Sequence, residues 1–217
     1  MIKLVVFDCD GTLVDGQSPI CDAMEAAFAA AGLPAPDRNA VRRIVGLSLP
    51  QALLELAPDA GEAARAHALE AYKASFRAAR SEGTLEQPLY PGMGALLHRL
   101  HAAGRTLGVA TGMSDRGLRA CLTRHGVHEL FATLQTADRH PSKPHPAMLE
   151  AALFEAGAAP GEAVMVGDTV FDMAMARGAG VRAVGVAWGY HEPAELLEAG
   201  AAGVAANVEE LEALIDG

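Results

Sequence analysis

Short apolar runs alternate with helix-like patterns through most of the chain. The first run, "KLVVF" at residues 3–7, is continuous and β-branched, which is typical of a strand that is buried on both faces. Further strands are predicted at 105–111, 131–137, 163–168 and 181–187, and helices near 114–125, 145–157, 170–178 and from 207 onward. Regular alternation of strand and helix predicts an α/β fold with a doubly wound parallel, Rossmann-like sheet.

Residues 18–82 interrupt this alternation because they carry only helical patterns. The stretch that starts at Ser18 has Ser as a possible cap, Pro19 at the expected first helical position and Gly32 at its end. Further helical patterns follow at 37–45, 49–57 and 61–80. We therefore predict an all-helical cap domain at 17–83, inserted into a catalytic core made of 1–16 and 84–217. Segments rich in Gly and Pro at 15–19 and 81–94 are the expected hinges.

Composition narrows the class of protein. The chain has 217 residues, of which 51% are hydrophobic and 20% charged, as expected for a soluble globular protein. It contains no run of about 20 apolar residues, so we expect no membrane span and a cytoplasmic location. The net charge of -10 disfavours binding to nucleic acid or to an anionic membrane. Cys9, Cys21 and Cys121 are expected to be buried free thiols. The sequence is compatible with either a monomer or a homodimer.

Polar residues stand where the predicted strands end, and the ligand crevice of a parallel sheet lies at that edge. They are Asp8 and Asp10 after the first strand, Thr111 at the end of the second, Lys143 before a helix, and Asp168 and Asp172 after the fourth. Since side chains alternate along a strand, Asp8 and Asp10 should point to the same side. Two like charges this close need a cation, and oxygen ligands favour Mg²⁺.

The same residues suggest a reaction. A carboxylate can attack phosphorus if a metal ion and a lysine, here Lys143, neutralise the repulsion between the two anions. The Thr111 hydroxyl and nearby backbone N–H groups could hold phosphate oxygens. One aspartate of the first pair would then be the nucleophile and the other the general acid and base.

Four motifs, "DCDGT", "ATG", "SKPHP" and "GDTVFD", occur in an order that resembles the haloacid dehalogenase-like phosphatases with a helical cap. The stretches "DGTLVD", "GLSLPQAL" and "SKPHPAML" are most similar to phosphoglycolate phosphatases. The resemblance implies that Asp8 becomes a phosphoaspartate and that Asp10 is the acid for the leaving group and then the base for water. It also implies that Mg²⁺ is bound by the Asp8 carboxylate, the Asp10 carbonyl and Asp168.

The resemblance assigns further roles to the remaining candidates. Thr111, Gly112 and Lys143 would hold the phosphoryl group, and Asp172 would orient Lys143 or a metal-bound water. Gly46 lies in the cap loop that would face the substrate. This loop lacks the Lys and Arg of similar sugar-phosphate mutases, and Met113 replaces a frequent Lys.

We therefore expect a Mg²⁺-dependent phosphatase that hydrolyses a small phosphorylated metabolite, of the phosphoglycolate type, through an aspartyl-phosphate. A sugar-phosphate mutase of the same family remains an alternative. So does a non-catalytic phospho-accepting module similar to a response-regulator receiver, although such a module would be shorter and would lack the helical insertion.

Several candidates also have ordinary structural interpretations. Asp168 could be a helix N-cap, Thr111 a cap and Lys143 a solvated loop residue. The scattered histidines are expected at the surface. Arg42 and Arg43 are expected on a solvated helix face, unless one of them turns toward the cleft and meets a substrate anion.

Overall fold

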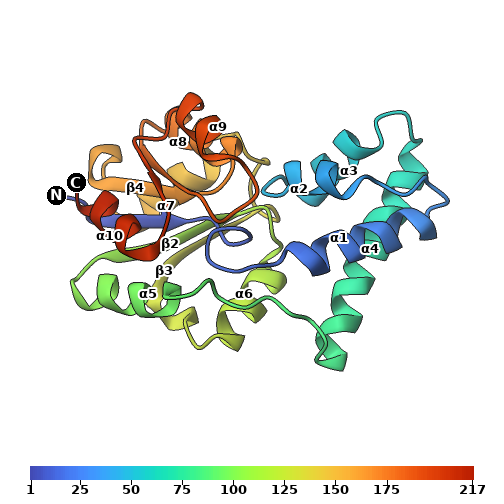
Figure 1. Ribbon diagram of the computed structural model, residues 1–217, viewed down its shortest axis with the longest axis horizontal. Coiled ribbons are helices and arrows are strands. Elements are labelled where there is room, and N and C mark those ends of the chain that lie inside the picture. The colour runs from blue at the N-terminus through green and yellow to red at the C-terminus, as the bar shows by residue number, and fades with distance from the viewer.

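A computed structural model describes all residues, 1–217, and has a single parallel sheet at its centre (Figure 1). The strand order is β3-β2-β1-β4-β5-β6. The strands are β1 (Leu4–Phe7), β2 (Thr106–Thr111), β3 (Phe131–Thr136), β4 (Ala163–Gly167), β5 (Arg182–Val186) and β6 (Val204–Ala205). All neighbouring pairs are parallel, so the predicted doubly wound α/β class is confirmed.

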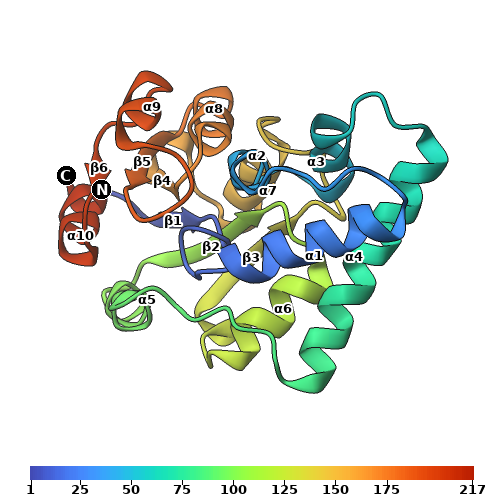
Figure 2. The same cartoon turned by 45° about the vertical axis from the view of Figure 1, so that its right-hand side comes forward.

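Helices cover both faces of the sheet (Figure 2). One face packs on α5 (Met93–Ala102), α6 (Asp115–Arg124) and α10 (Val208–Asp216), and the other on α7 (Ala147–Ala156), α8 (Val170–Gly178) and α9 (Pro193–Glu198). The surroundings of β1 explain its apolar composition. Val5 and Phe7 belong to the first hydrophobic cluster, whereas Leu4 and Val6 belong to the second. Both faces of β1 are therefore buried, which is why its apolar run is continuous.

Three elements of the core were not predicted. Helix α5 begins at Met93, inside the Gly/Pro-rich segment 81–94, which hides its start, although Met93, Leu96, Leu97 and Leu100 have helical spacing and are buried. Helix α9 is short, and β6 has only two residues, which is too little sequence to show a strand period.

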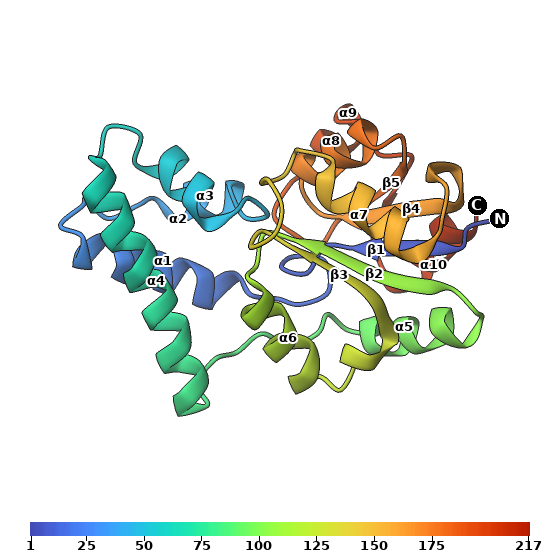
Figure 3. The same ribbon diagram turned by 180° about the vertical axis from the view of Figure 1, so that it is seen from behind.

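Helices α1 (Gln17–Ala30), α2 (Arg38–Arg43), α3 (Leu49–Leu56) and α4 (Glu62–Glu82) lie apart from the sheet, beyond the end of β1 that leads to Asp8 (Figures 1 and 3). They have a hydrophobic cluster of their own, which includes Met24, Phe28 and Leu53. We propose that they form the cap and that it moves as a unit. None of the helices combines the length and the apolarity that a bilayer crossing requires.

The start of α1 differs from the prediction. The helix begins at Gln17 with Gly16 as its N-cap, so Ser18 is not the cap. The Gln17 N–H instead donates to the Asp15 carboxylate over 3.2 Å, and the Ser18 hydroxyl donates to Asp22 within the helix. An aspartate two residues before the first helical N–H groups satisfies the helix start better than the later serine.

The two crossings between core and cap are paired with each other. The Asp15 N–H donates to the Pro88 carbonyl over 2.9 Å, and the Tyr90 N–H donates to the Leu13 carbonyl over 3.0 Å. Val14 and Leu89 form an antiparallel bridge between these bonds. The chain therefore enters and leaves the cap through one short two-stranded ribbon.

The packing of α5 gives a test of the core. Leu97 is fully buried, so Leu97→Ala should lower the free energy of unfolding by about 2–5 kcal/mol, because the truncation leaves a cavity. Leu197 is 52% exposed, and Leu197→Ala should change stability by no more than about 0.5 kcal/mol. Urea denaturation of both variants measures the difference. Equal losses would show that α5 does not pack as described.

Candidate active site

The carboxylate of Asp8 lies at the end of β1 and is 1% exposed. Its Oδ1 accepts hydrogen bonds from the Cys9 N–H over 2.7 Å and from the Lys143 ammonium over 2.9 Å. Its Oδ2 is buried and has no hydrogen-bond donor. An unpartnered carboxylate oxygen in the protein interior is costly, so this atom marks a position that a cation or a ligand would occupy.

Lys143 carries the positive charge at the base of the site. Its ammonium is fully buried and lies 2.6 Å from Asp172 Oδ1 as well as 2.9 Å from Asp8 Oδ1. Burial alone would lower the pKa of this lysine, but the two carboxylates outweigh it and raise the pKa above its ordinary value. Lys143 therefore stays charged, and the interpretation as a solvated loop residue is wrong.

Asp168 and Asp172 follow β4 and are both fully buried. Asp168 accepts from the Thr12 hydroxyl over 2.8 Å and from the Tyr190 N–H over 3.0 Å. Asp172 accepts from the hydroxyl and the N–H of Thr169, over 2.7 and 3.1 Å. Thr169 is the N-cap of α8, so the alternative that Asp168 caps this helix is wrong.

Glycines make room for the Asp168 carboxylate. At Gly11, a Cβ atom would lie 2.2 Å from Asp168 Oδ2, and at Gly189 it would lie 2.2 Å from Asp168 Cβ. Gly11 also has a φ of +87°, which other residues rarely adopt. Both glycines are therefore required for the backbone to pass this close to the acid.

Three carboxylates and one ammonium give this buried cluster a surplus of negative charge. Oxygen atoms of Asp8, Asp168 and Asp172 all lie within 4.8 Å of one another. Burial, opposed by Lys143 and reinforced by Asp172, raises the pKa of Asp8 to about 6. Burial and Asp8 together raise the pKa of Asp168 well above its usual range. With its unpartnered oxygen and oxygen-only donors, the cluster fits a hard divalent cation such as Mg²⁺.

The carboxylate of Asp10 lies outside this cluster, although the residue lines the same cavity as Asp8. Burial and the charge of Asp8 raise the pKa of Asp10 to about 7. The Gln87 amide donates to its Oδ1 over 3.4 Å. A carboxyl with a pKa near neutrality can both give and take a proton, which is what a general acid and base requires.

Gln87 is a site residue that the sequence analysis missed. It is 5% exposed and stands in the segment that was interpreted only as a hinge. Its backbone carbonyl accepts a hydrogen bond from His125 Nε2 over 2.7 Å, which fixes this part of the segment against α6. A single glutamine in a linker gives no pattern that could have identified it.

Thr111 and Gly112 form the second side of the site, at the end of β2. The buried Thr111 hydroxyl accepts from the Met113 N–H over 3.2 Å, so its own proton remains available for a ligand. At Gly112, a Cβ atom would lie 2.4 Å from the Leu47 carbonyl oxygen. The cap loop therefore lies directly on this glycine, and Met113 lines the cavity beside it.

Other contacts also hold this loop and the end of α2 against the core. The Ser48 N–H donates to the Ser142 hydroxyl over 2.8 Å, and Gly46 has a φ of +99° where it passes Thr169. The Arg43 guanidinium pairs with Glu195 of α9 over 2.6 Å. His191 Nε2 contacts the Arg43 carbonyl over 3.0 Å. The cap loop and the end of α2 are thus in direct contact with the core.

The positions of two arginines and one histidine can be compared with the sequence predictions. Neither Arg42 nor Arg43 lines the cavity, so neither side chain faces the space that a substrate would occupy. His191 is 3% exposed, so the expectation of surface histidines is wrong at this position. The Val170 N–H donates to His191 Nδ1 over 3.3 Å, and the ring therefore serves as a bridge between α8 and α2. By contrast, the three cysteines are free and buried as expected.

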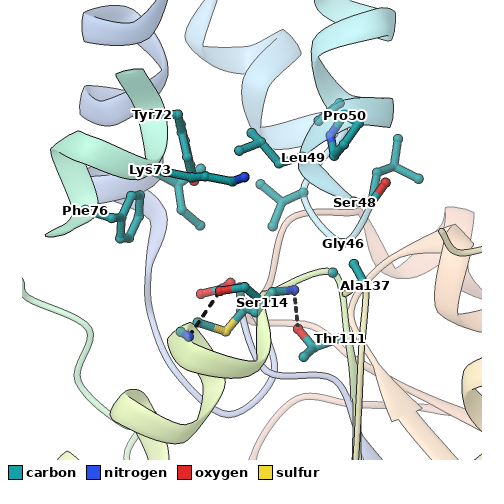
Figure 4. A pocket seen from close by; sticks show the side chains of 18 of the residues that line it. Gly46, Ser48, Leu49, Pro50, Tyr72, Lys73, Phe76, Thr111, Ser114 and Ala137 are labelled. Carbon is teal, nitrogen blue, oxygen red and sulfur yellow. Dashed lines mark hydrogen bonds between the residues drawn. The ribbon is translucent and has the colours of Figure 1, made fainter. Parts of the chain in front are cut away.

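A cavity of about 470 Å³ lies between cap and core. Asp8, Asp10, Thr111 and Gly112 form its core side. The cap side is formed by the loop at Gly46 and by apolar side chains of α1, α3 and α4 (Figure 4). Lys143, Asp168 and Asp172 lie behind this surface and do not line the cavity. A ligand in the cavity would therefore meet Asp8, Asp10 and Thr111 directly.

Known proteins resemble the chain over most of its length. The sequence profile of the haloacid dehalogenase-like hydrolases matches residues 5–186. "Probable phosphatase IndB" of Dickeya dadantii (strain 3937) is 38% identical, over 90% of this chain and 86% of its own length. The phosphoglycolate phosphatase of Rhodospirillum rubrum is 35% identical, over 92% of this chain and 86% of its own length.

A solved structure gives the same result for the fold. A haloacid dehalogenase-like family hydrolase from Streptococcus pneumoniae is 28% identical and covers 98% of both chains, with a TM-score of 0.85. The profile match extends from β1 to the end of β5. The alignment with the solved structure covers nearly the whole chain and so includes the helical insertion. The chain therefore belongs to the haloacid dehalogenase-like hydrolases and is an enzyme of that family.

Proposed function

We propose that this haloacid dehalogenase-like phosphatase hydrolyses a small phosphomonoester through a phosphoryl group carried on Asp8, with Mg²⁺ as cofactor. The observation that carries the proposal is the pairing of two different acids in one cavity. Asp8 is held by Lys143 and the Cys9 N–H, whereas Asp10 has a pKa near neutrality and lies outside the acidic cluster. These differences support Asp8 as the nucleophile and Asp10 as the group that moves protons.

In the first step, a carboxylate oxygen of Asp8 attacks phosphorus and the bond between phosphorus and the leaving oxygen breaks. Asp10 gives its proton to that oxygen, so the leaving group departs as a neutral alcohol. In the second step, Asp10 takes a proton from water, the water oxygen attacks phosphorus, and the bond to Asp8 breaks. Inorganic phosphate leaves and both aspartates return to their starting states.

The other residues of the site would hold the phosphoryl group and balance its charge. Lys143 is charged and fixed between Asp8 and Asp172, so from behind the cavity surface it can neutralise the charge on Asp8. The free proton of the Thr111 hydroxyl can donate to a second oxygen. Bound Mg²⁺ would neutralise further negative charge, held by Asp8, Asp168 and the Asp10 carbonyl with Asp172 nearby.

The substrate class is proposed from two lines of support. The Rhodospirillum rubrum and Vibrio vulnificus relatives are named as phosphatases of a small metabolite, phosphoglycolate, and the cavity between cap and core suits a small phosphorylated metabolite. We also propose a cytoplasmic location, where such metabolites occur. The cap over the site disfavours a phospho-accepting receiver module, which must exchange its phosphoryl group with a protein.

Turnover tests the phosphatase proposal directly. With p-nitrophenyl phosphate in large excess, the enzyme should release p-nitrophenol and inorganic phosphate in equal amounts over many cycles. A phospho-accepting module would release only one equivalent of p-nitrophenol per protein molecule and then stop. A sugar-phosphate mutase would return the phosphoryl group to a sugar phosphate instead of releasing it to water.

Metal dependence follows from the acidic cluster. Activity should vanish with EDTA and return with Mg²⁺, because the surplus negative charge around Asp8 otherwise repels a phosphate. Asp168→Asn should weaken Mg²⁺ binding in calorimetry and reduce the rise in melting temperature that Mg²⁺ produces. Asp59→Asn, at an exposed acid of the cap, should leave both unchanged. Full turnover in excess EDTA would refute the metal proposal.

Asparagine variants of Asp8 and Asp10, the two aspartates that follow β1, should lose activity in different ways. Asp8→Asn should form no phosphoenzyme, because an amide is a very poor nucleophile. Asp10→Asn should still be phosphorylated by an activated aryl phosphate, whose leaving group needs no proton, but hydrolysis should slow by about 10²–10⁴. Rapid quench and mass spectrometry of Asp10→Asn should find one phosphoryl group on the peptide that contains Asp8. A label on a serine, threonine or histidine would disprove this assignment.

The raised pKa of Asp10 has a consequence for stability. Since its pKa is about 7 in the folded protein and about 4 when unfolded, the folded state holds more protons between these values. The stability contributed by Asp10 is therefore present at low pH and is lost as the pH rises through 7. In metal-free buffer, Asp10→Asn should melt higher than the wild type above pH 7, and the difference should shrink toward pH 4. A difference that does not vary with pH would contradict the shift.

A further inference from the structure

Helix α4 presents two adjacent stripes of side chains to the cavity. Leu69, Tyr72 and Phe76 recur at intervals of three and four residues and line the cavity as an apolar stripe. The Tyr72 and Phe76 rings lie 5.0 Å apart between centroids. The cationic stripe, Lys73, Arg77 and Arg80, has the same spacing and also lines the cavity.

Figure 4 shows Tyr72 and Phe76 of the apolar stripe and Lys73 of the cationic stripe at the cavity. The Lys73 side chain extends from α4 across the cavity, between Tyr72 and Leu49 and on the side opposite Thr111. Its ammonium is 3.1 Å from Glu70 of the same helix, but this ion pair is exposed and therefore weak. Arg116 of α6 lines the cavity from the core. Positive charge is thus supplied to the cavity by both the cap and the core.

The arginines at the cavity have no partners of their own. Most arginines of this acidic chain bind a carboxylate or a carbonyl, as Arg43 binds Glu195 and Arg99 binds Glu212. Arginine side chains with neither a hydrogen bond nor an ion pair are Arg77, Arg80, Arg116, Arg119 and Arg177, and the first three of these line the cavity. Unpaired guanidinium groups around a cavity are well suited to bind an anion.

The size of the cavity indicates how large a leaving group it can hold. A volume of about 470 Å³ falls within the range of about 300–1,000 Å³ that holds ligands of many heavy atoms. A two-carbon leaving group would leave much of the apolar stripe uncovered. A larger leaving group could cover Tyr72 and Phe76 and still reach the cations of α4 and α6.

We propose that the leaving group of the substrate has a flat apolar body, which packs on Tyr72 and Phe76, and a second anionic group, which pairs with Arg77 and Arg116. This inference rests on the proposed phosphatase function and specifies its substrate class. Lys73 and Arg80 extend the same positive surface. The second anion could be a carboxylate or a phosphate, since a guanidinium group binds both through the same fork of N–H donors.

The test compares matched aryl phosphates. Phenyl phosphate offers only the apolar body, 4-carboxyphenyl phosphate adds a carboxylate, and hydroquinone bisphosphate adds a phosphate. In the wild type, kcat/KM should be higher for at least one of the two doubly anionic esters than for phenyl phosphate. The better of the two identifies the second anion as a carboxylate or a phosphate.

Variants then assign this preference to residues. Arg77→Gln and Arg116→Gln should each lower the kcat/KM ratio of the preferred ester to phenyl phosphate by about fivefold, the effect of losing roughly 1 kcal/mol. Arg119→Gln is the matched control, because Arg119 is on α6 and unpaired but does not line the cavity. Its ratio should equal that of the wild type. Phe76→Ala should lower kcat/KM for phenyl phosphate more than for phosphoglycolate, which has no ring.

Other outcomes are distinguishable. Turnover of phenyl phosphate with no preference for either doubly anionic ester would overturn this inference and leave the proposed function intact. An equal loss of the ratio in Arg116→Gln and Arg119→Gln would also overturn it, because the effect would then come from general surface charge. If none of the esters is hydrolysed, the proposed function and the inference both fail.

Discussion

The contact on which the site depends is the buried ammonium of Lys143 between the carboxylates of Asp8 and Asp172, at 2.9 and 2.6 Å. Without this charge, the buried acids at the ends of β1 and β4 would repel one another with little screening by solvent. The parallel sheet brings these residues together because β1 and β4 are neighbours and end at the same edge. Lys143 alone does not balance the carboxylates, which is why we propose a divalent cation beside it.

This charge balance also explains the local backbone. A cluster of buried acids must be surrounded by donors, and the chain supplies them through the Thr12 and Thr169 hydroxyls and the Tyr190 N–H. Backbone donors can approach closely only where side chains are absent, as at Gly11 and Gly189. These positions carry no reacting group, yet they hold the acids in place.

The sequence predicted best what depends on neighbouring residues in the chain. The strand pattern and the polar residues at strand ends were sufficient for the fold class, and they placed Asp8, Lys143 and Asp168 at one edge. What it missed depends on contacts between distant segments. Gln87 and Arg116 line the cavity because the linker and α6 face the cap, and His191 lies buried between α8 and α2. The sequence predicts Ser18 as the cap of α1 because a serine before a proline is a common helix start. In the structure, the first N–H of the helix instead donates to the Asp15 carboxylate.

The paired crossings have a consequence for how the enzyme admits its substrate. Two linkers with no contact between them would allow the cap to move relative to the core in many directions. A ribbon whose strands are joined by the Asp15 to Pro88 and Tyr90 to Leu13 hydrogen bonds resists shear and bends mainly across its face. We therefore propose that the cap moves relative to the core in essentially one direction. Each closure would return the Gly46 loop to the same position against Gly112. The leaving group would then bind in the same orientation in every catalytic cycle.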